Sequence, residues 1–238
     1  MLLDKFCTIS NGKVSFTRHQ ASSFAKQIAD DFNPLHDEDA KRFCVPGDLL
    51  FSLALAKSGL SQQMTFTFSG MVTDGIELTF PDHSDNNNAI IDDKNKKYVS
   101  ICVDGSKTSD TQTINALTQA YVAFSGRTFP QLLVALMAEN KVMINPTRPM
   151  IMYESMSINL DTLNFSSVEL VLASSTLSIE GKRGTADLIF NLISAGKIIG
   201  HGKKHMILSG LRPYEQTKID EIISTYNIKK SHYLTTVQ

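Results

Sequence analysis

An aspartate and a histidine stand close together in one short stretch of this chain, Asp31-Phe32-Asn33-Pro34-Leu35-His36. Pro34 fixes its own φ and disfavours helical backbone at Asn33, so the chain is expected to bend between the two side chains. A carboxylate and an imidazole that meet in one volume can activate a water molecule by general acid–base catalysis. We therefore take Asp31 and His36 as candidate catalytic residues.

The same stretch also has a purely structural interpretation. Asp, Asn and Pro are common in turns, so Asp31 could end a helix while Asn33 begins a turn. His36 could then be a surface residue or a cap for the segment that follows it. At the level of the sequence this alternative stays open.

The segments around this stretch have the patterns of helices and strands. Residues 23–29 have helical spacing, with Phe24 and Ile28 on one face. Residues 46–56 predict a helix that begins with a proline and is apolar on nearly all sides, which favours a buried position. Alternating runs typical of strands follow at residues 65–68, 75–80 and 98–103.

The second half of the chain repeats this order. Residues 117–124 predict a helix, and residues 129–137 predict a second, proline-started helix that is again apolar on nearly all sides. Between them, Phe124-Ser125-Gly126-Arg127 replaces the Asp/His stretch, so this half is expected to act as a scaffold and tunnel wall. Strand-like runs follow, separated by turns, at residues 150–159, 168–179, 185–193 and 198–208.

A helix without a polar face must be covered on most sides, and a curved antiparallel sheet can cover it. The sequence therefore predicts an α+β fold of the double hot-dog type, with two antiparallel sheets, each wrapped around a buried central helix. Its expected parts are a first repeat with the Asp/His stretch, a second repeat, and a C-terminal helix with a tail: residues 1–110, 111–212 and 213–238. The two repeats would form a pseudo-dimer within one chain, and a homodimer of such chains stays open.

Two segments are expected to lie outside the repeated elements. The polar residues 81–97 predict a solvent loop within the first half. Residues 213–228 predict the C-terminal helix, with Ile219, Ile222 and Ile223 on one stripe, and the chain from Lys229 onward is expected to be loose.

The start of the helix at residues 46–56 offers a place for a developing negative charge. The first N–H groups of a helix lack acceptors within it and carry a partial positive charge, and Gly47 allows a ligand to approach. Gly47 and Asp48 are therefore candidate oxyanion- or substrate-binding residues, together with Asn33. Two structural alternatives remain, since Pro46-Gly47 could be an ordinary helix-starting turn and Asp48 could cap the helix.

Residues Asp31 to His36 match the D-x-N-P-L-H signature of the MaoC-like hydratases, and the chain resembles this family. Its members are hot-dog enzymes that add water across the double bond of an enoyl thioester. The resemblance implies a hydratase or dehydratase in which Asp31 and His36 activate the water. It implies an acyl-CoA or acyl-carrier-protein thioester as the substrate and no cofactor. The run from Phe43 to Leu50 also resembles an uncharacterised bacterial family.

Two other functions stay open. The segment between His36 and Gly47 is shorter than in the MaoC-like enzymes, and a second histidine of the family pattern has no counterpart here. The chain could therefore be an acyl-thioester-binding protein without catalysis. Hot-dog folds also host thioesterases, and the fold alone does not choose between these activities.

Composition argues against several classes of partner. The formal net charge of the 238 residues is -1, without the basic excess that is typical of nucleic-acid binding. No apolar run approaches the ~18 residues that span a membrane, and the N-terminus lacks a signal-peptide core. The three cysteines include no C-x-x-C pair, which favours reduced thiols, no metal site and a cytoplasmic location.

Weaker signals have simple structural explanations. His201 and His205 share a face of an expected strand but lack further ligands for a metal. Cys44 is expected to be a buried thiol and not a nucleophile, and the methionines between residues 137 and 156 could fill the core or line an acyl tunnel. A basic cluster is explained as a solvated sheet face, or alternatively as a contact for coenzyme A phosphates or an acidic carrier protein: Lys182, Arg183, Lys197, Lys203 and Lys204.

Overall fold

The computed structural model describes residues 3–81 and 87–236, and its largest element is a 10-stranded antiparallel sheet. In spatial order the strands are β1 (Thr8–Ser10), β2 (Lys13–Ser15), β4 (Leu78–Thr79), β5 (Asn87–Asp92), β6 (Lys97–Thr108), β3 (Leu60–Phe68), β8 (Ile151–Leu160), β11 (Lys197–Ser209), β10 (Arg183–Ser194) and β9 (Glu169–Glu180). Two short strands pair separately, β7 (Val142–Met143) and β12 (Arg212–Pro213).

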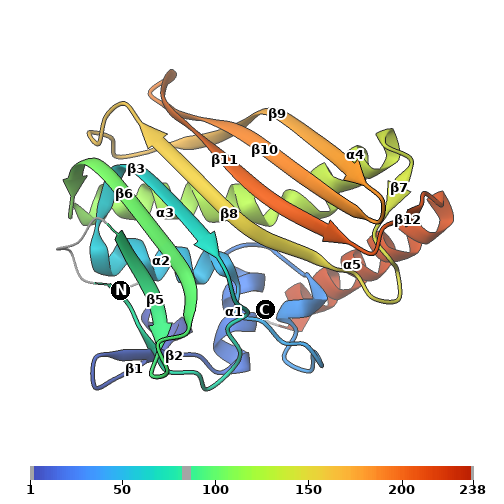
Figure 1. The fold of residues 1–238 in the computed structure, drawn as a ribbon, viewed down its shortest axis with the longest axis horizontal. Coiled ribbons are helices and arrows are strands. Elements are labelled where there is room, and N and C mark those ends of the chain that lie inside the picture. The colour runs from blue at the N-terminus through green and yellow to red at the C-terminus, as the bar shows by residue number, and fades with distance from the viewer. Residues whose placement is uncertain (1–2, 82–86, 237–238) are drawn as a thin grey trace.

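The helices lie along one face of this sheet and at its end. They are α1 (Arg18–Gln27), α2 (Gly47–Ser58), α3 (Thr111–Gly126), α4 (Leu133–Glu139) and α5 (Gln216–Thr236), with short 3-10 turns at Asp4–Phe6 and Pro34–His36. In the view of Figure 1 the sheet lies in front of α2 and α3, which contact each other. No α-helix in the described ranges is long and apolar enough to cross a membrane.

The two halves of the molecule meet at strands β3 and β8. Met64 of β3 pairs with Ile158 of β8, and Phe66 of β3 pairs with Met156 of β8; all four side chains are buried. The predicted double hot dog is confirmed, but its two sheets are joined edge to edge into one. This pairing satisfies the backbone groups that two separate sheet edges would leave exposed.

Helix α2 is the buried helix that the sequence predicts at residues 46–56. Pro46 precedes it, Gly59 ends it with a φ of 84°, and every side chain from Asp48 to Leu55 is buried. Phe51 packs between the two layers, with ring centroids 5.1 Å from Phe66 of β3 and 4.8 Å from Tyr121 of α3. Packing on both sides explains why the helix has no polar face.

The second half departs from the expected pair of helices. The helix predicted at residues 117–124 is the longer α3, which contacts α2 and β9. The helix predicted at residues 129–137 is wrong only at Phe129, which is extended (φ -122°, ψ 135°). The physical reason is Pro130, since a residue before proline is disfavoured in the helical region. Helical backbone runs from Pro130, in the π-helical segment Thr128–Leu132, into α4.

The predicted solvent loop at residues 81–97 is also wrong in part. Strand β5 pairs with β4 and β6, and its Ile90 is fully buried, so much of this segment belongs to the sheet. Residues 82–86 lie outside the described residues. Of the strand predicted at residues 75–80, only Leu78–Thr79 pairs.

Helix α5 is longer than predicted and packs against the first half of the chain. It continues to Thr236, so the prediction of a loose tail from Lys229 is wrong for the described part of that segment. Lys229 forms an ion pair with Asp37 at 2.5 Å, and Tyr233 accepts a hydrogen bond from Gln27 of α1 at 2.9 Å. These contacts bring the C-terminal helix beside the Asp/His stretch. The division at residues 110 and 212 stays a prediction.

Candidate functional site

A cavity of about 370 Å³ lies between the two halves of the protein. All five predicted site residues line it: Asp31, Asn33, His36, Gly47 and Asp48. The second half contributes the end of α3 and side chains of β8 and β11. The halves touch here so closely that a Cβ on Gly126 of α3 would stand 1.5 Å from the backbone oxygen of Ala29. Only glycine fits at this position.

The structure brings the carboxylate of Asp31 and the imidazole of His36 together. Asp31 Oδ2 lies 3.8 Å from His36 Nε2, and both side chains are largely buried. His36 Nδ1 lies 2.7 Å from the backbone oxygen of Cys44, which places the ring proton of a neutral His36 on Nδ1. Nε2 then keeps its lone pair, so one water molecule could donate hydrogen bonds to both atoms of the pair.

The turn between them is built by Asn33 and Pro34, as the structural interpretation of the sequence expects. The side-chain oxygen of Asn33 accepts a hydrogen bond from the Leu35 N–H at 3.1 Å and starts the 3-10 turn Pro34–His36. The Asn33 N–H in turn donates to Asp31 Oδ1 at 2.9 Å. Asp31 and Asn33 thus form the turn and line the cavity at the same time.

Helix α5 fixes the backbone on both sides of Asp31, a role that the sequence did not indicate. The Tyr226 hydroxyl donates to the Asp30 carbonyl at 3.1 Å and accepts from the Phe32 N–H at 3.3 Å. Phe32 is buried, with its ring edge-on to those of Tyr226 and Tyr233. Asp30 has a positive φ of 54°, which non-glycine residues adopt only with support from their surroundings.

Gly47 and Asp48 stand at the start of α2, facing the cavity. A Cβ on Gly47 would lie 3.0 Å from the Tyr153 ring and 3.1 Å from the Phe68 ring, so its lack of a side chain also makes room for these aromatics. The alternative in which Asp48 caps the helix is wrong, since α2 has no side-chain cap hydrogen bond. Asp48 is instead buried, and burial raises its pKa against the opposing effects of the Lys204 charge and a Ser125 hydrogen bond.

Lys204 lines the cavity, so the sequence-based prediction that it lies on a solvated sheet face is wrong. It pairs with the buried Leu188 and Met156 across the sheet, so it points into the molecule and not to the solvated face. Its ammonium lies 2.5 Å from Ser125 Oγ and 3.3 Å from Thr128 Oγ1. Burial lowers the pKa of Lys204. The alternation along β11 could have shown this, because Lys204 shares its face with Gly200, Gly202, Met206 and Leu208.

The neighbouring Lys203 does lie on the solvated face, as predicted for the basic cluster. It forms an ion pair with Asp187 at 2.8 Å. His205 lies on the same face and contacts Asp187 at 2.5 Å and Glu154 at 3.0 Å. Within residues 3–81 and 87–236, no group of three His, Cys, Asp or Glu side chains is arranged to hold a metal ion.

The remaining candidates have structural roles or line the cavity. Burial raises the pKa of the Cys44 thiol to about 11, which disfavours the thiolate that a nucleophile needs. Among the methionines, Met150 and Met152 line the cavity, whereas Met137, Met143 and Met156 are buried in the core.

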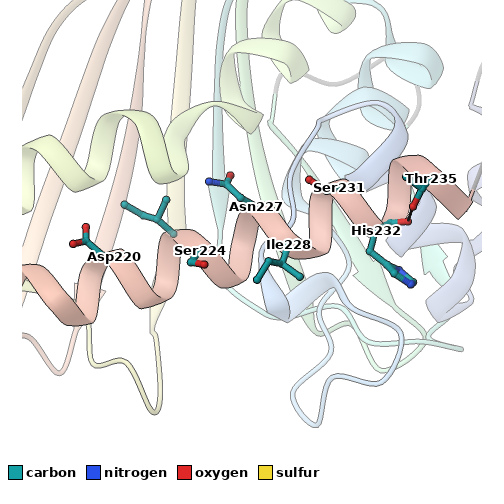
Figure 2. A pocket seen from close by; sticks show the side chains of 8 residues that line it. Asp220, Ser224, Asn227, Ile228, Ser231, His232 and Thr235 are labelled. Carbon is teal, nitrogen blue, oxygen red and sulfur yellow. Dashed lines mark hydrogen bonds between the residues drawn. The ribbon is translucent and has the colours of Figure 1, made fainter.

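A second hollow runs along the outer side of α5 (Figure 2). The side chains around it come from that one helix and include Asp220, Ser224, Asn227, Ile228, Ser231 and His232. The cavity between the halves is different, because it brings together polar groups from distant parts of the chain. We therefore take the inner cavity as the candidate active site.

The chain is similar to several solved structures. The tesB protein of Mycobacterium avium subsp. paratuberculosis is 11% identical over 69% of this chain and 87% of that chain, with a TM-score of 0.44. An acyl-CoA thioesterase II, TesB2, of Mycobacterium marinum is 8% identical over 91% and 99%, with a TM-score of 0.41. A hot-dog protein of unknown function from Alicyclobacillus acidocaldarius is 8% identical over 90% and 99%, with a TM-score of 0.47. Identities and TM-scores this low do not indicate a shared activity.

Among curated proteins, none matches this chain. One family model does match, over residues 1–217, which include both halves of the sheet and the whole Asp/His stretch. The chain belongs to the family described as Protein of unknown function (DUF3581).

Proposed function

We propose that this protein is an enzyme that adds water to the double bond of an enoyl thioester. The observation that carries the proposal is the pair Asp31 and His36, 3.8 Å apart in a largely apolar cavity beside the N-terminus of α2. The pair can activate water, and an apolar cavity suits an acyl chain. The D-x-N-P-L-H signature supports the same reaction.

In the proposed reaction, a water molecule first donates one hydrogen bond to Asp31 Oδ2 and one to His36 Nε2. As its oxygen bonds to the β-carbon, His36 Nε2 takes one proton and the π electrons move toward the thioester oxygen. The imidazolium then returns the proton to the α-carbon, so that H and OH are added in total. The Asp31 carboxylate orients the water and stabilises the transient positive charge on His36.

The start of α2 is proposed to bind the thioester oxygen. Its first two residues, Gly47 and Asp48, line the same cavity as Asp31 and His36. Unpaired N–H groups and the helix dipole would stabilise the negative charge that develops on this oxygen. The Asn33 side-chain oxygen already holds the turn, so this residue contributes through the geometry of the loop.

The proposal is tested by incubating the purified protein with trans-2-enoyl thioesters of several chain lengths, carried on coenzyme A or on acyl carrier protein. Loss of enoyl absorbance without release of thiol is the expected result, and the preferred carrier identifies the partner. Release of free thiol would indicate a thioesterase that uses the same water on the thioester carbon. Binding without any turnover would indicate an acyl-thioester-binding protein, and no binding would contradict the whole proposal.

Replacing Tyr226 with Phe is expected to lower kcat about tenfold, because small displacements of a catalytic group cost this much or more. The substitution keeps the ring beside Phe32 but removes both hydrogen bonds that hold the peptides around Asp31. A positioning role predicts a change in kcat with little change in KM.

The matched control for this variant is Tyr233→Phe. Tyr233 also packs its ring on Phe32, but its hydroxyl contacts only the Gln27 side chain among the described hydrogen bonds. Steady-state kinetics of both variants test whether the Tyr226 hydroxyl positions Asp31. Equal effects of the two substitutions, or an effect on KM alone, would show that the Tyr226 hydroxyl does not position Asp31.

A further inference from the structure

One wall of the largely apolar cavity is polar, which an unsubstituted acyl chain does not require. Its polar side chains are Asp48 from α2, Ser125 and Thr128 from the end of α3 and the turn after it, and Lys204 from β11. These four side chains are less than a tenth exposed. A polar atom that is buried without a hydrogen-bond partner is costly, because it loses its hydrogen bonds to water.

One atom of this wall has no partner. Oδ1 of Asp48 is buried and accepts no hydrogen bond from any described residue. Lys204 is held differently, with its ammonium donating to Ser125 at 2.5 Å and to Thr128 at 3.3 Å over the Tyr153 ring. The wall therefore offers an unused acceptor at Asp48 beside a cation and a hydroxyl that can donate.

The opposite charges of Asp48 and Lys204 favour a neutral ligand group that both donates and accepts hydrogen bonds. A carboxylate on the acyl chain would be repelled by Asp48, and an ammonium would be repelled by Lys204. A bare alkyl chain would leave the Asp48 carboxyl desolvated without compensation. A hydroxyl group donates to Asp48 Oδ1 and accepts from Lys204 or Thr128, which matches the wall.

We propose that Asp48, Thr128 and Lys204 form a subsite for a hydroxyl group on the acyl chain, beyond the carbons that react. The substrate class is then a hydroxylated acyl thioester and not a plain fatty acyl thioester. This inference rests on the proposed function, since it assigns the substrate of the same cavity. The second half of the chain would then help to select the substrate, in addition to acting as a scaffold.

The test uses thioether analogues of both carriers, coenzyme A and acyl carrier protein, which can be neither hydrated nor hydrolysed. Each S-alkyl chain is prepared in several lengths, with and without a terminal hydroxyl, and binding is measured by titration calorimetry. At the best length the hydroxylated analogue is expected to bind about tenfold more tightly, the value of one buried hydrogen bond to a charged group.

The variant that removes the subsite is the double substitution Lys204→Met with Asp48→Leu. Replacing both buried charged side chains with apolar ones leaves no buried charge without compensation, so this protein is expected to fold. It should lose the preference for the hydroxyl, so that the plain and hydroxylated chains bind with equal affinity. Lys203→Met is the matched control, because Lys203 lies next in sequence on the solvated face; it should keep the preference.

The outcomes separate the two proposals. Equal binding of plain and hydroxylated analogues to the unaltered protein, or a preference that survives in the double variant, overturns the subsite but leaves the enoyl-thioester reaction untouched. Failure of every analogue to bind overturns both. A hydroxyl preference that disappears only in the double variant supports the subsite, whatever the hydration assay shows.

Discussion

Replacing Asp31 with Asn is expected to lower kcat/KM for hydration of a trans-2-enoyl thioester by at least about 10²-fold. Asn keeps the size of the side chain and an oxygen that can accept from the Asn33 N–H, so the turn is preserved. It removes the negative charge that orients the water and stabilises the His36 imidazolium 3.8 Å away. Initial-rate kinetics with the preferred enoyl thioester measure the effect.

The control for this variant is Asp30→Asn, the same substitution one residue earlier. Asp30 pairs with Lys230 at the surface, and Asn tolerates its positive φ. Its rate should stay within a few-fold of the original, because the side chain is outside the cavity lining. A similar loss in both variants would mean that the loop is damaged generally, and an active Asp31→Asn protein would remove Asp31 from the mechanism.

The elements with a strong local pattern could be predicted from the sequence. Helix α2 was predictable because a run of apolar residues on all sides of a helix requires cover, and the structure places it between the sheet and α3. The helix predicted at residues 129–137 starts one residue too early, because Pro130 disfavours helical backbone at Phe129. Strand β5 was missed because Ile90, which pairs with Val99 of β6 and is buried, has polar neighbours in the sequence.

The candidate site could be predicted only where it is local in sequence. Asp31 and His36 lie in one turn, so their proximity follows from the chain itself. Lys204 and Ser125 are 79 positions apart, and Tyr226 and Asp30 are 196 apart, so these contacts exist only in the folded molecule. For Lys204 the alternation of β11 was a usable signal, whereas no local pattern connects Tyr226 with the loop that it holds.

The single substitution Lys204→Met is expected to lower the free energy of unfolding by about 3–5 kcal/mol, because it leaves a buried carboxyl group without its compensating charge. Ser125 accepts from Lys204 at 2.5 Å, and the Lys204 charge and Ser125 both act to lower the pKa of Asp48 against the effect of burial. Adding Asp48→Leu should restore most of the loss, since an apolar pair of similar volume has no charge to desolvate. Urea denaturation of both single variants and the double variant gives the coupling energy directly.

The solvated neighbour again serves as the control for this stability prediction. Lys203 pairs with Asp187 at 2.8 Å, but both side chains are partly exposed, so Lys203→Met should change the free energy of unfolding by only about 0–1 kcal/mol. If Lys204→Met lowered the free energy of unfolding no more than Lys203→Met, the buried charge of Lys204 would contribute no more to stability than the exposed charge of Lys203. If the losses of Lys204→Met and Asp48→Leu simply added in the double variant, the two side chains would not act as a pair. The expected result, a large single loss with recovery in the double variant, would show that the inner wall is an electrostatic unit whose two members come from different halves of the chain.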